Sequence, residues 1–403
     1  MKPRRQNVSG RTIYRRFTRS MTRLHQNSLP VPDELVYEIL SRLPSKAIAR
    51  CRCVCNLWSS VLRRQDFTDS FLTKSSAHPQ LLFVFEGYSE IHFFSSPQPE
   101  NPEENSYVVA SNHLACFPSP FSLFLCTSGF SCYGQNLILN CKAKMVICNP
   151  STGQSFTLPK LTFKRKTNYV LYTYYGYDLI EKNFKVLSMA CWPASNGLTS
   201  VEHQVLTLGA KRLSWRMVEC CIPHLPSCGS KWICISGVLY YLAAANSWSL
   251  ESMVVCFDFR TEKFTLINCM ETFNRALPDS TNMVNYNGKL GLLMSGDSHD
   301  VTPASTSFEL WVLLDAAKHE WSKHVYVLPP SWEDVVAETM CITGMVGTNE
   351  IVFSPLYQRV PSYVIYFNVE RKTITKVGIL GMEAFQGKIF NTYLNFVENV
   401  KLL

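Results

Sequence analysis

The first 32 residues contain no acidic side chain, and this absence accounts for the charge of the whole protein. Eight lysines and arginines lie in this segment, whereas the rest of the chain holds 31 basic and 31 acidic residues. The net charge of +8 therefore belongs to the N-terminal segment alone. Nucleic-acid binding requires basic residues that neutralise phosphates, so a neutral body gives no support to a nucleic-acid partner.

Several other features are also missing. The chain has no run of 18 apolar residues and no hydrophobic signal peptide, so we expect no membrane partner. It has 16 cysteines but no Cys-x-x-Cys pair, and most of these cysteines lie within apolar runs. This usage is typical of small buried side chains in a reducing compartment. Cys51, Cys53 and Cys55 have two possible roles, a zinc site or packing in the core. Packing is favoured because only Cys51 and Cys55 would share a helical face.

The segment from Val31 to Leu62 has the pattern of two short helices. Pro32 suits the first position of a helix, acidic residues follow it in the first turn, and Pro44 ends the helix. A second apolar set steps by three or four residues and predicts one continuous helix; its members are Ile48, Cys51, Cys55, Trp58 and Leu62. So small a unit cannot bury this apolar surface alone and needs a partner or a neighbouring domain.

These residues also carry a family resemblance. Pro32-Asp-Glu-Leu35, Glu38-Ile39-Leu40, Arg42-Leu43-Pro44 and the Cys55–Trp58 spacing resemble the F-box over about positions 31–73. The resemblance implies docking on a SKP-type adaptor, which joins a cullin scaffold. The residues expected to make this contact, or to shape it, are Pro32, Leu35, Ile39, Leu40, Leu43, Pro44, Ile48, Val54, Cys55 and Trp58. The alternative is an ordinary helical hairpin packed on the rest of the chain.

Beyond position 80 the chain repeats a strand, a polar turn led by Asp, Asn or Gly, and a second strand. The turns are marked by residues 149, 209, 258, 315 and 368, which are 60, 49, 57 and 53 positions apart. Asp and Asn suit these turns because their side chains accept hydrogen bonds from backbone N–H groups two residues further on. A second marker, a strand led by glycine, recurs at Gly237, Gly288 and Gly347. This period, with no helical crossovers, predicts a β-propeller of about six four-stranded blades.

The repeat region resembles the F-box-associated domain of plant F-box proteins, through Gly176-Tyr-Asp178 and Phe184-Lys-Val186. It also resembles kelch repeats, although the kelch double glycine is absent. A pair of β-sandwiches with coincidental spacing is the alternative. The expected fold is therefore a small all-α F-box at 29–76 followed by a large all-β propeller at 77–403. A basic, disordered tail at 1–28 precedes them; it is a solvated extension, a nuclear address or a transit peptide.

No catalytic constellation is found in the sequence. Gly129 to Gly134 misses the Gly-x-Ser-x-Gly nucleophile elbow by one residue, and no phosphate-binding glycine loop or zinc spacing occurs. We therefore expect no cofactor, no metal and no enzymatic activity. Trp192, Trp248 and Trp332 lie in loop-like stretches and are candidate anchors for a protein substrate, although inward packing is favoured for each one taken alone.

Three hypotheses follow. The favoured one is a substrate-recognition subunit of an SCF-type ubiquitin ligase, which binds an unidentified protein substrate and works in the nucleus, the cytoplasm or both. The second is a non-catalytic scaffold or sequestering protein that binds the adaptor without ligase output. The third is an enzyme with its active site in the propeller channel, which predicts a metal or a perturbed acid–base pair there.

Overall fold

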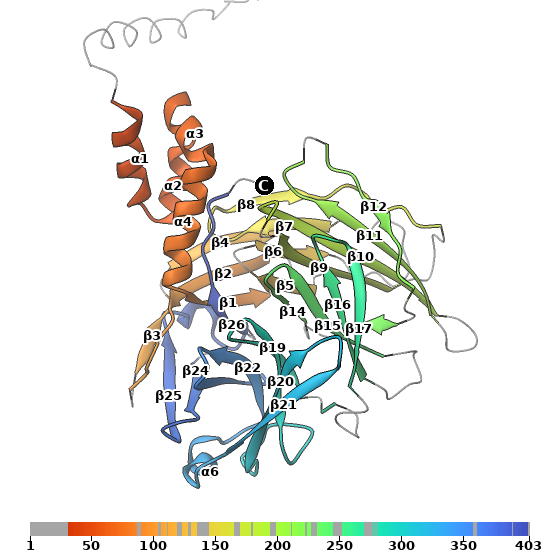
Figure 1. Cartoon of the computed structure of the whole chain (residues 1–403). Helices are drawn as coiled ribbons and strands as arrows, with labels where there is room; N and C mark the ends of the chain where they lie inside the picture. The colour runs from red at the N-terminus through yellow and green to blue at the C-terminus, as the bar shows by residue number, and fades with distance from the viewer. Residues whose placement is uncertain are drawn as a thin grey trace, which may run out of the picture.

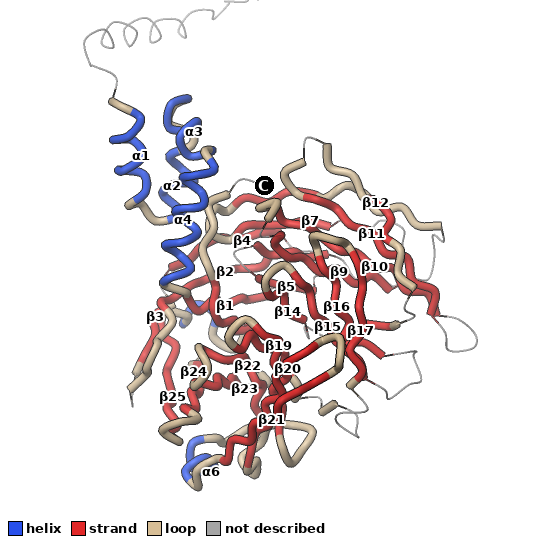
Figure 2. The backbone as a smooth tube through the Cα atoms, in the orientation of Figure 1, coloured by secondary structure: helices blue, strands red, loops and turns tan. Residues whose placement is uncertain are grey.

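A small helical unit stands beside a larger body of strands in the computed structural model of the chain (Figure 1, Figure 2). The structure describes residues 31–401 except for short gaps, which are 87–89, 104–105, 111, 119–122, 128–129, 135–144, 165–169, 179, 194–198, 211, 222–223, 227–231, 245–251, 270–276, 279, 358–360 and 389. The basic tail predicted at 1–28 lies outside the described residues. In the described part of the chain, no helix has both the length and the apolar character to cross a bilayer.

Four helices make up the first unit. They are α1 (Asp33–Ser41), α2 (Ser45–Cys51), α3 (Asn56–Arg63) and α4 (Gln65–Ala77). The prediction of one continuous helix from Ile48 to Leu62 is wrong, because the chain turns between α2 and α3. Cys55 is extended there, with φ −159° and ψ 167°, and this turn lets α3 pack against α1. Cys51 and Cys55 therefore share no helical face: Cys51 is half-buried and Cys55 is exposed.

The strands that the structure describes in the second unit form six sheets. Three of them, in chain order, contain β1 (Gln80–Glu86), β2 (Glu90–Pro97), β4 (Asn112–Pro118) and β26 (Phe390–Phe396); β5 (Leu123–Thr127), β6 (Phe130–Gly134), β7 (Met145–Asn149) and β8 (Gln154–Thr157); and β9 (Val170–Asp178), β10 (Asn183–Pro193), β11 (Thr199–Thr207) and β12 (Arg216–Val218).

The other three sheets complete the domain. They contain β13 (Leu225–Pro226), β14 (Trp232–Ile235), β15 (Val238–Ala244), β16 (Ser252–Asp258) and β17 (Lys263–Asn268); β18 (Asn282–Tyr286), β19 (Lys289–Ser295), β20 (Ser307–Asp315) and β21 (Glu320–Val327); and β22 (Met340–Val346), β23 (Glu350–Pro355), β24 (Ser362–Asn368), β25 (Thr373–Leu380) and β3 (Tyr107–Val109). Two short helical turns, α6 (Ser331–Val335) and η1 (Glu383–Phe385), lie in connections.

The sheets follow one another as the blades of a propeller. Strands of neighbouring sheets contact one another, as β18 contacts β14 and β22, and β22 contacts β26. The C-terminal strand β26 pairs with β1, so one sheet holds both ends of the β domain and closes the ring. The predicted architecture, an all-α unit followed by an all-β propeller, is confirmed.

The turn residues act as the sequence predicts. Oδ1 of Asp258, between β16 and β17, accepts the backbone N–H groups of Arg260 (2.7 Å) and Thr261 (3.2 Å). Equivalent side-chain bonds are made by Asn149, Asp315 and Asn368 in three other sheets. The turn at residue 209 has no such side chain, and its glycine takes a φ of +84°, which other residues rarely adopt.

The Gly176-Tyr-Asp178 signature joins two neighbouring sheets. A Cβ on Gly176 would lie 2.3 Å from the ring of Phe259, so only glycine fits this position without movement. Nζ of Lys185 lies 3.2 Å from Oδ2 of Asp178 and donates to the carbonyl oxygen of Phe259 at 2.8 Å. Burial alone would raise the pKa of Asp178, but two backbone N–H donors and Lys185 outweigh it and lower that pKa. The signature is thus a buried cross-link between β9, β10 and the turn after β16.

Candidate functional site: an exposed apolar face on the helical unit

Helix α1 presents apolar side chains on two sides. Val36 and Leu40, four residues apart, are 2% and 0% exposed and face the core of the helical unit. Leu35 and Ile39, also four residues apart, are 55% and 54% exposed. Residues spaced by four share one helical face, so these two form an outward apolar stripe, and Val31 lies just before it with 50% exposure. Exposed leucine and isoleucine side by side make this stripe a candidate contact surface.

The inner side of α1 packs into a core shared by all four helices. Its fully buried members are Val36, Leu40, Ile48, Val61, Leu62, Phe67 and Val400. Tyr37 packs edge-on against Phe67, with ring centroids 5.3 Å apart, and the guanidinium of Arg64 lies over the tyrosine ring. The packing of the adjacent face of α1 therefore holds in place the helix that carries the outward stripe.

The residues predicted to serve the adaptor contact divide into three groups by exposure. The exposed ones are Pro32, Leu35, Ile39, Pro44, Val54 and Cys55; the half-buried ones are Leu43 and Trp58; and the buried ones are Leu40 and Ile48. The structure brings Leu40, Leu43, Ile48 and Trp58 together in the helical core. Leu35 and Ile39 lie on a neighbouring, exposed face of α1, and Val54 is 60% exposed in the turn before α3. Sequence reasoning missed Val36, although its spacing of four from Leu40 was a usable signal.

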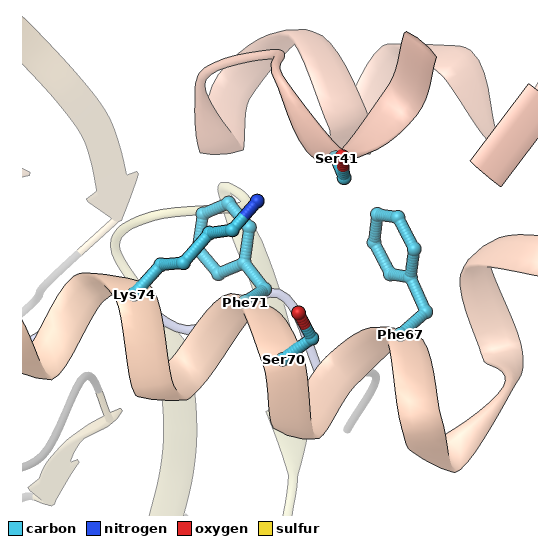
Figure 3. Close-up of a pocket in the computed structure, with 5 residues that line it drawn as sticks. All are labelled: Ser41, Phe67, Ser70, Phe71 and Lys74. Atoms are coloured by element: carbon cyan, nitrogen blue, oxygen red, sulfur yellow. The ribbon is translucent and has the colours of Figure 1, made fainter. Parts of the chain in front are cut away.

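A shallow hollow lies between the end of α1 and the middle of α4 (Figure 3). Ser41, Phe67, Ser70, Phe71 and Lys74 line it, and it has no room to enclose even a water-sized group. This hollow therefore offers no small-molecule site.

The C-terminal segment after β26 fastens the helical unit to the propeller. Val400 is fully buried among the helices, and Oγ of Ser45 donates to the buried carboxylate of Glu398 at 3.0 Å. On the propeller side, Nδ2 of Asn149 donates to the carbonyl oxygen of Asn399 at 2.8 Å. Burial raises the pKa of Glu398, and the Ser45 hydroxyl opposes this shift. The last residues of the chain thus bind both domains, a contact that no local sequence pattern indicated.

Polar contacts at the same boundary add to the clamp that Glu398, Asn399 and Val400 form between the two domains. Nζ of Lys182, in the turn between β9 and β10, lies 2.7 Å from the carboxylate of Asp69 on α4. Nζ of Lys46 donates to the backbone oxygen of His113 at 2.8 Å. Arg52 donates to the carbonyl oxygen of Val400. Together with the buried Val400, these contacts hold the helical unit in one orientation on the propeller.

The tryptophans expected at loop rims require a correction. Trp192 lies in β10, is 3% exposed and packs edge-on against Phe163. Trp332 lies in α6, is 2% exposed, and its Nε1 donates to the carbonyl oxygen of Thr302 at 3.0 Å. Both were wrongly placed in loops, because strand pairing extends β10 up to Pro193 and Trp332 fills the core beside Phe353. Buried side chains cannot anchor a partner, and Trp248 lies outside the described residues.

Comparison with known families now identifies the chain. A model of the F-box domain matches residues 29–70, and a model of the F-box associated beta propeller domain matches residues 80–400. The chain is an F-box protein with an F-box-associated β-propeller. It is 46% identical over 408 residues to F-box protein At5g65850 of Arabidopsis thaliana, covering 100% of this chain and 99% of that protein. F-box protein DOR of the same plant is 47% identical over 413 residues, covering 100% of both chains.

Solved structures give a weaker likeness. Hydrazine synthase of Kuenenia stuttgartiensis aligns with a TM-score of 0.39 and 7% identity, covering 82% of this chain and 49% of that one. This likeness is too low to carry an argument. The family rests instead on the two matched domains, and the F-box is the helical unit that bears the exposed stripe.

Proposed function

We propose that this F-box protein is a substrate-recognition subunit of an SCF-type ubiquitin ligase. The observation that carries the proposal is the pair Leu35 and Ile39, more than half exposed on a helix whose adjacent face, with Val36 and Leu40, is buried. Such a pair would be covered by a SKP-type adaptor, through which a cullin scaffold would join the assembly. Val54 supplies a further exposed apolar residue on the same domain.

The propeller would present a protein substrate to the ligase. The protein would accelerate transfer by proximity, since holding two reactants together raises their effective concentration. This role benefits from the clamp formed by Glu398, Asn399 and Val400, because a fixed F-box orientation limits the positions that a bound substrate can reach. The proposed role is thus non-catalytic, and Trp248 remains a predicted substrate contact outside the described residues.

Reconstitution tests this proposal. The full chain is mixed with a purified SKP-type adaptor and cullin–RING scaffold, and assembly is followed by size-exclusion chromatography. We expect one stable complex for the wild type and none for the Leu35→Glu/Ile39→Glu variant, because two carboxylates would be desolvated at the interface. Unchanged assembly by that variant would contradict the proposal.

A scaffold or sequestering protein without ligase output is the second candidate. The same apolar stripe supports it, because adaptor docking is common to both roles. The two are separated in cells by comparing proteins stabilised by proteasome inhibition with those stabilised by loss of the F-box. A substrate receptor predicts binding partners whose abundance rises in both conditions, whereas a scaffold predicts none.

We also propose that the protein works in the nucleus, the cytoplasm or both. The eight basic residues within the first 32 positions support a nuclear address. A fluorescent fusion of the full chain, compared with one in which Arg4, Arg5, Arg15 and Arg16 are replaced by Gln, tests this. Loss of nuclear signal in the variant is expected, and an organellar signal would contradict the proposal.

A further inference from the structure

Two histidines and a cysteine meet between the third and fourth sheets, far from the F-box stripe in the sequence. His203 lies on β11, while Cys220 and His224 lie in the connection from β12 to β13. One ligand atom from each of the three residues lies within 4.8 Å of the other two. His203 and His224 are 3% and 0% exposed, and Cys220 is half-buried.

The His203 ring is the unusual member of this cluster. Its Nε2 is buried and, among the residues that the structure describes, has no hydrogen-bond partner. Buried polar atoms are nearly always paired, so an unpaired one requires an ion or a water molecule to complete it. Phe264 packs against the ring at 4.8 Å, which shields this side from solvent.

The His224 ring is held by a second interaction. Its Nε2 lies 2.6 Å from the hydroxyl of Tyr241 on β15, and both groups are buried. A metal-ligating histidine usually uses one nitrogen in this way, since the outer bond fixes the ring and selects the tautomer. The bond to Tyr241 therefore fixes the His224 ring beside that of His203, with ring centroids 5.5 Å apart.

We propose that His203, Cys220 and His224 bind one zinc ion. Two imidazoles and a thiolate form a donor set that suits zinc, with a fourth position open to water on the side of half-exposed Cys220. Zinc bonds of about 2.0 to 2.3 Å place ligand atoms roughly 3.3 to 3.8 Å apart. The three ligand atoms, which lie within 4.8 Å of one another, would move closer together to reach these values.

The site would act as a structural cross-link. It ties the connection from β12 to β13, which runs from the third sheet to the fourth, onto β11 of the third sheet. Tyr241 belongs to the fourth sheet, so the bound ion would stiffen the join between these two blades. This inference does not depend on the proposed ligase role.

Metal analysis of the full chain tests the proposal. The protein is produced with zinc in the medium, purified on a tag that contains no histidines, and analysed by mass spectrometry of its metals. We expect about one zinc per chain in the wild type and at least a fivefold lower content in Cys220→Ser and His203→Gln. The matched control is Cys221→Ser, which removes the exposed neighbouring thiol and should keep the zinc.

A spectroscopic arm keeps the test decisive if the histidine variant fails to fold. Cobalt added to the chelator-treated wild type should give the visible bands of a tetrahedral site and a thiolate-to-cobalt charge-transfer band. Cys220→Ser should lose the charge-transfer band. If the wild type contained no zinc and showed no cobalt bands, a water molecule would be the hydrogen-bond partner of His203 Nε2, and the proposal would be overturned.

The second cluster supplies another decisive control. Glu90, His92 and Cys116 also place ligand atoms within 4.8 Å of one another, but Glu90 and Cys116 are exposed. His92 Nε2 already lies 3.3 Å from the Glu90 carboxylate, so its imidazole has a partner. Zinc that survives Cys220→Ser and disappears in Cys116→Ser would place the ion there and overturn the proposal.

Discussion

Removing the two exposed side chains of α1 should weaken adaptor binding by an amount that the structure allows us to work out. The change is Leu35→Ala together with Ile39→Ala. Each substitution removes three carbon atoms, which contribute roughly 2.4 kcal/mol when fully transferred from water. The free chain still exposes 55% of Leu35 and 54% of Ile39, so about half of that transfer remains for the partner to complete.

The expected loss is about 1.3 kcal/mol for each side chain and about 2.6 kcal/mol for the pair. Since about 1.4 kcal/mol corresponds to a tenfold change in affinity, the double variant should bind roughly 50- to 100-fold more weakly. The assay is isothermal titration calorimetry of the full chain with a purified SKP-type adaptor. Because both side chains are largely exposed, the melting temperature should stay close to that of the wild type.

The matched control is Leu314→Ala on β20 of the propeller, whose side chain is 52% exposed. It removes the same atoms from a comparable surface outside the F-box and should leave the affinity unchanged. A double variant that binds within twofold of the wild type would refute the assignment of this stripe. Equal weakening by Leu314→Ala would also refute it, because the effect would then not be specific to α1.

Three further predictions concern the contact between the two domains and the buried cross-link between two sheets of the propeller. Val400→Ala should destabilise the F-box by about 2 kcal/mol by opening its core, seen as faster hydrogen exchange in α2 and α3 with unchanged exchange in the blades; equal change in both would contradict the clamp. Gly176→Ala should cost about 1–3 kcal/mol in chemical denaturation because its Cβ meets Phe259, and a neutral effect would show that the ring can move away freely. Lys185→Met should cost roughly 3 kcal/mol by leaving Asp178 buried without its cation. The pKa of Asp178 is lowered in the folded chain, so its carboxylate stabilises the fold at neutral pH, and this contribution is lost as the pH falls through that folded pKa. The free energy of unfolding of Lys185→Met should therefore fall less steeply with decreasing pH than that of the wild type. An equal pH dependence would contradict this.

Local patterns could predict the fold because they act over a few residues. Asp258 and Asp315 form their turns through bonds to backbone groups two and three positions on, so their spacing in the sequence indicates the strand pairs that they join. The same holds for Gly209, where the turn requires a positive φ. The break between α2 and α3 escaped prediction, because both halves have helical spacing and only packing of α3 on α1 selects the turn.

The candidate site was predicted only in part. The sequence placed Leu35, Ile39 and Leu40 together among the residues of the adaptor contact, but the fold divides them between the surface and the core. Trp192 looked like a loop residue because proline and glycine follow it, although tertiary packing buries it in a strand. Aromatic side chains near turn residues carry no local signal that separates a rim from a core.

The sequence by itself determined the two domains, the strand–turn period and the apolar character of the first helix. These depend on backbone propensities and on side-chain spacing within single elements. The tertiary structure alone decided which face of α1 stays exposed, that Val400 completes the F-box core, and that His203 meets Cys220 and His224. Such contacts join residues far apart in the chain. They can stabilise the protein only after folding has brought these residues together.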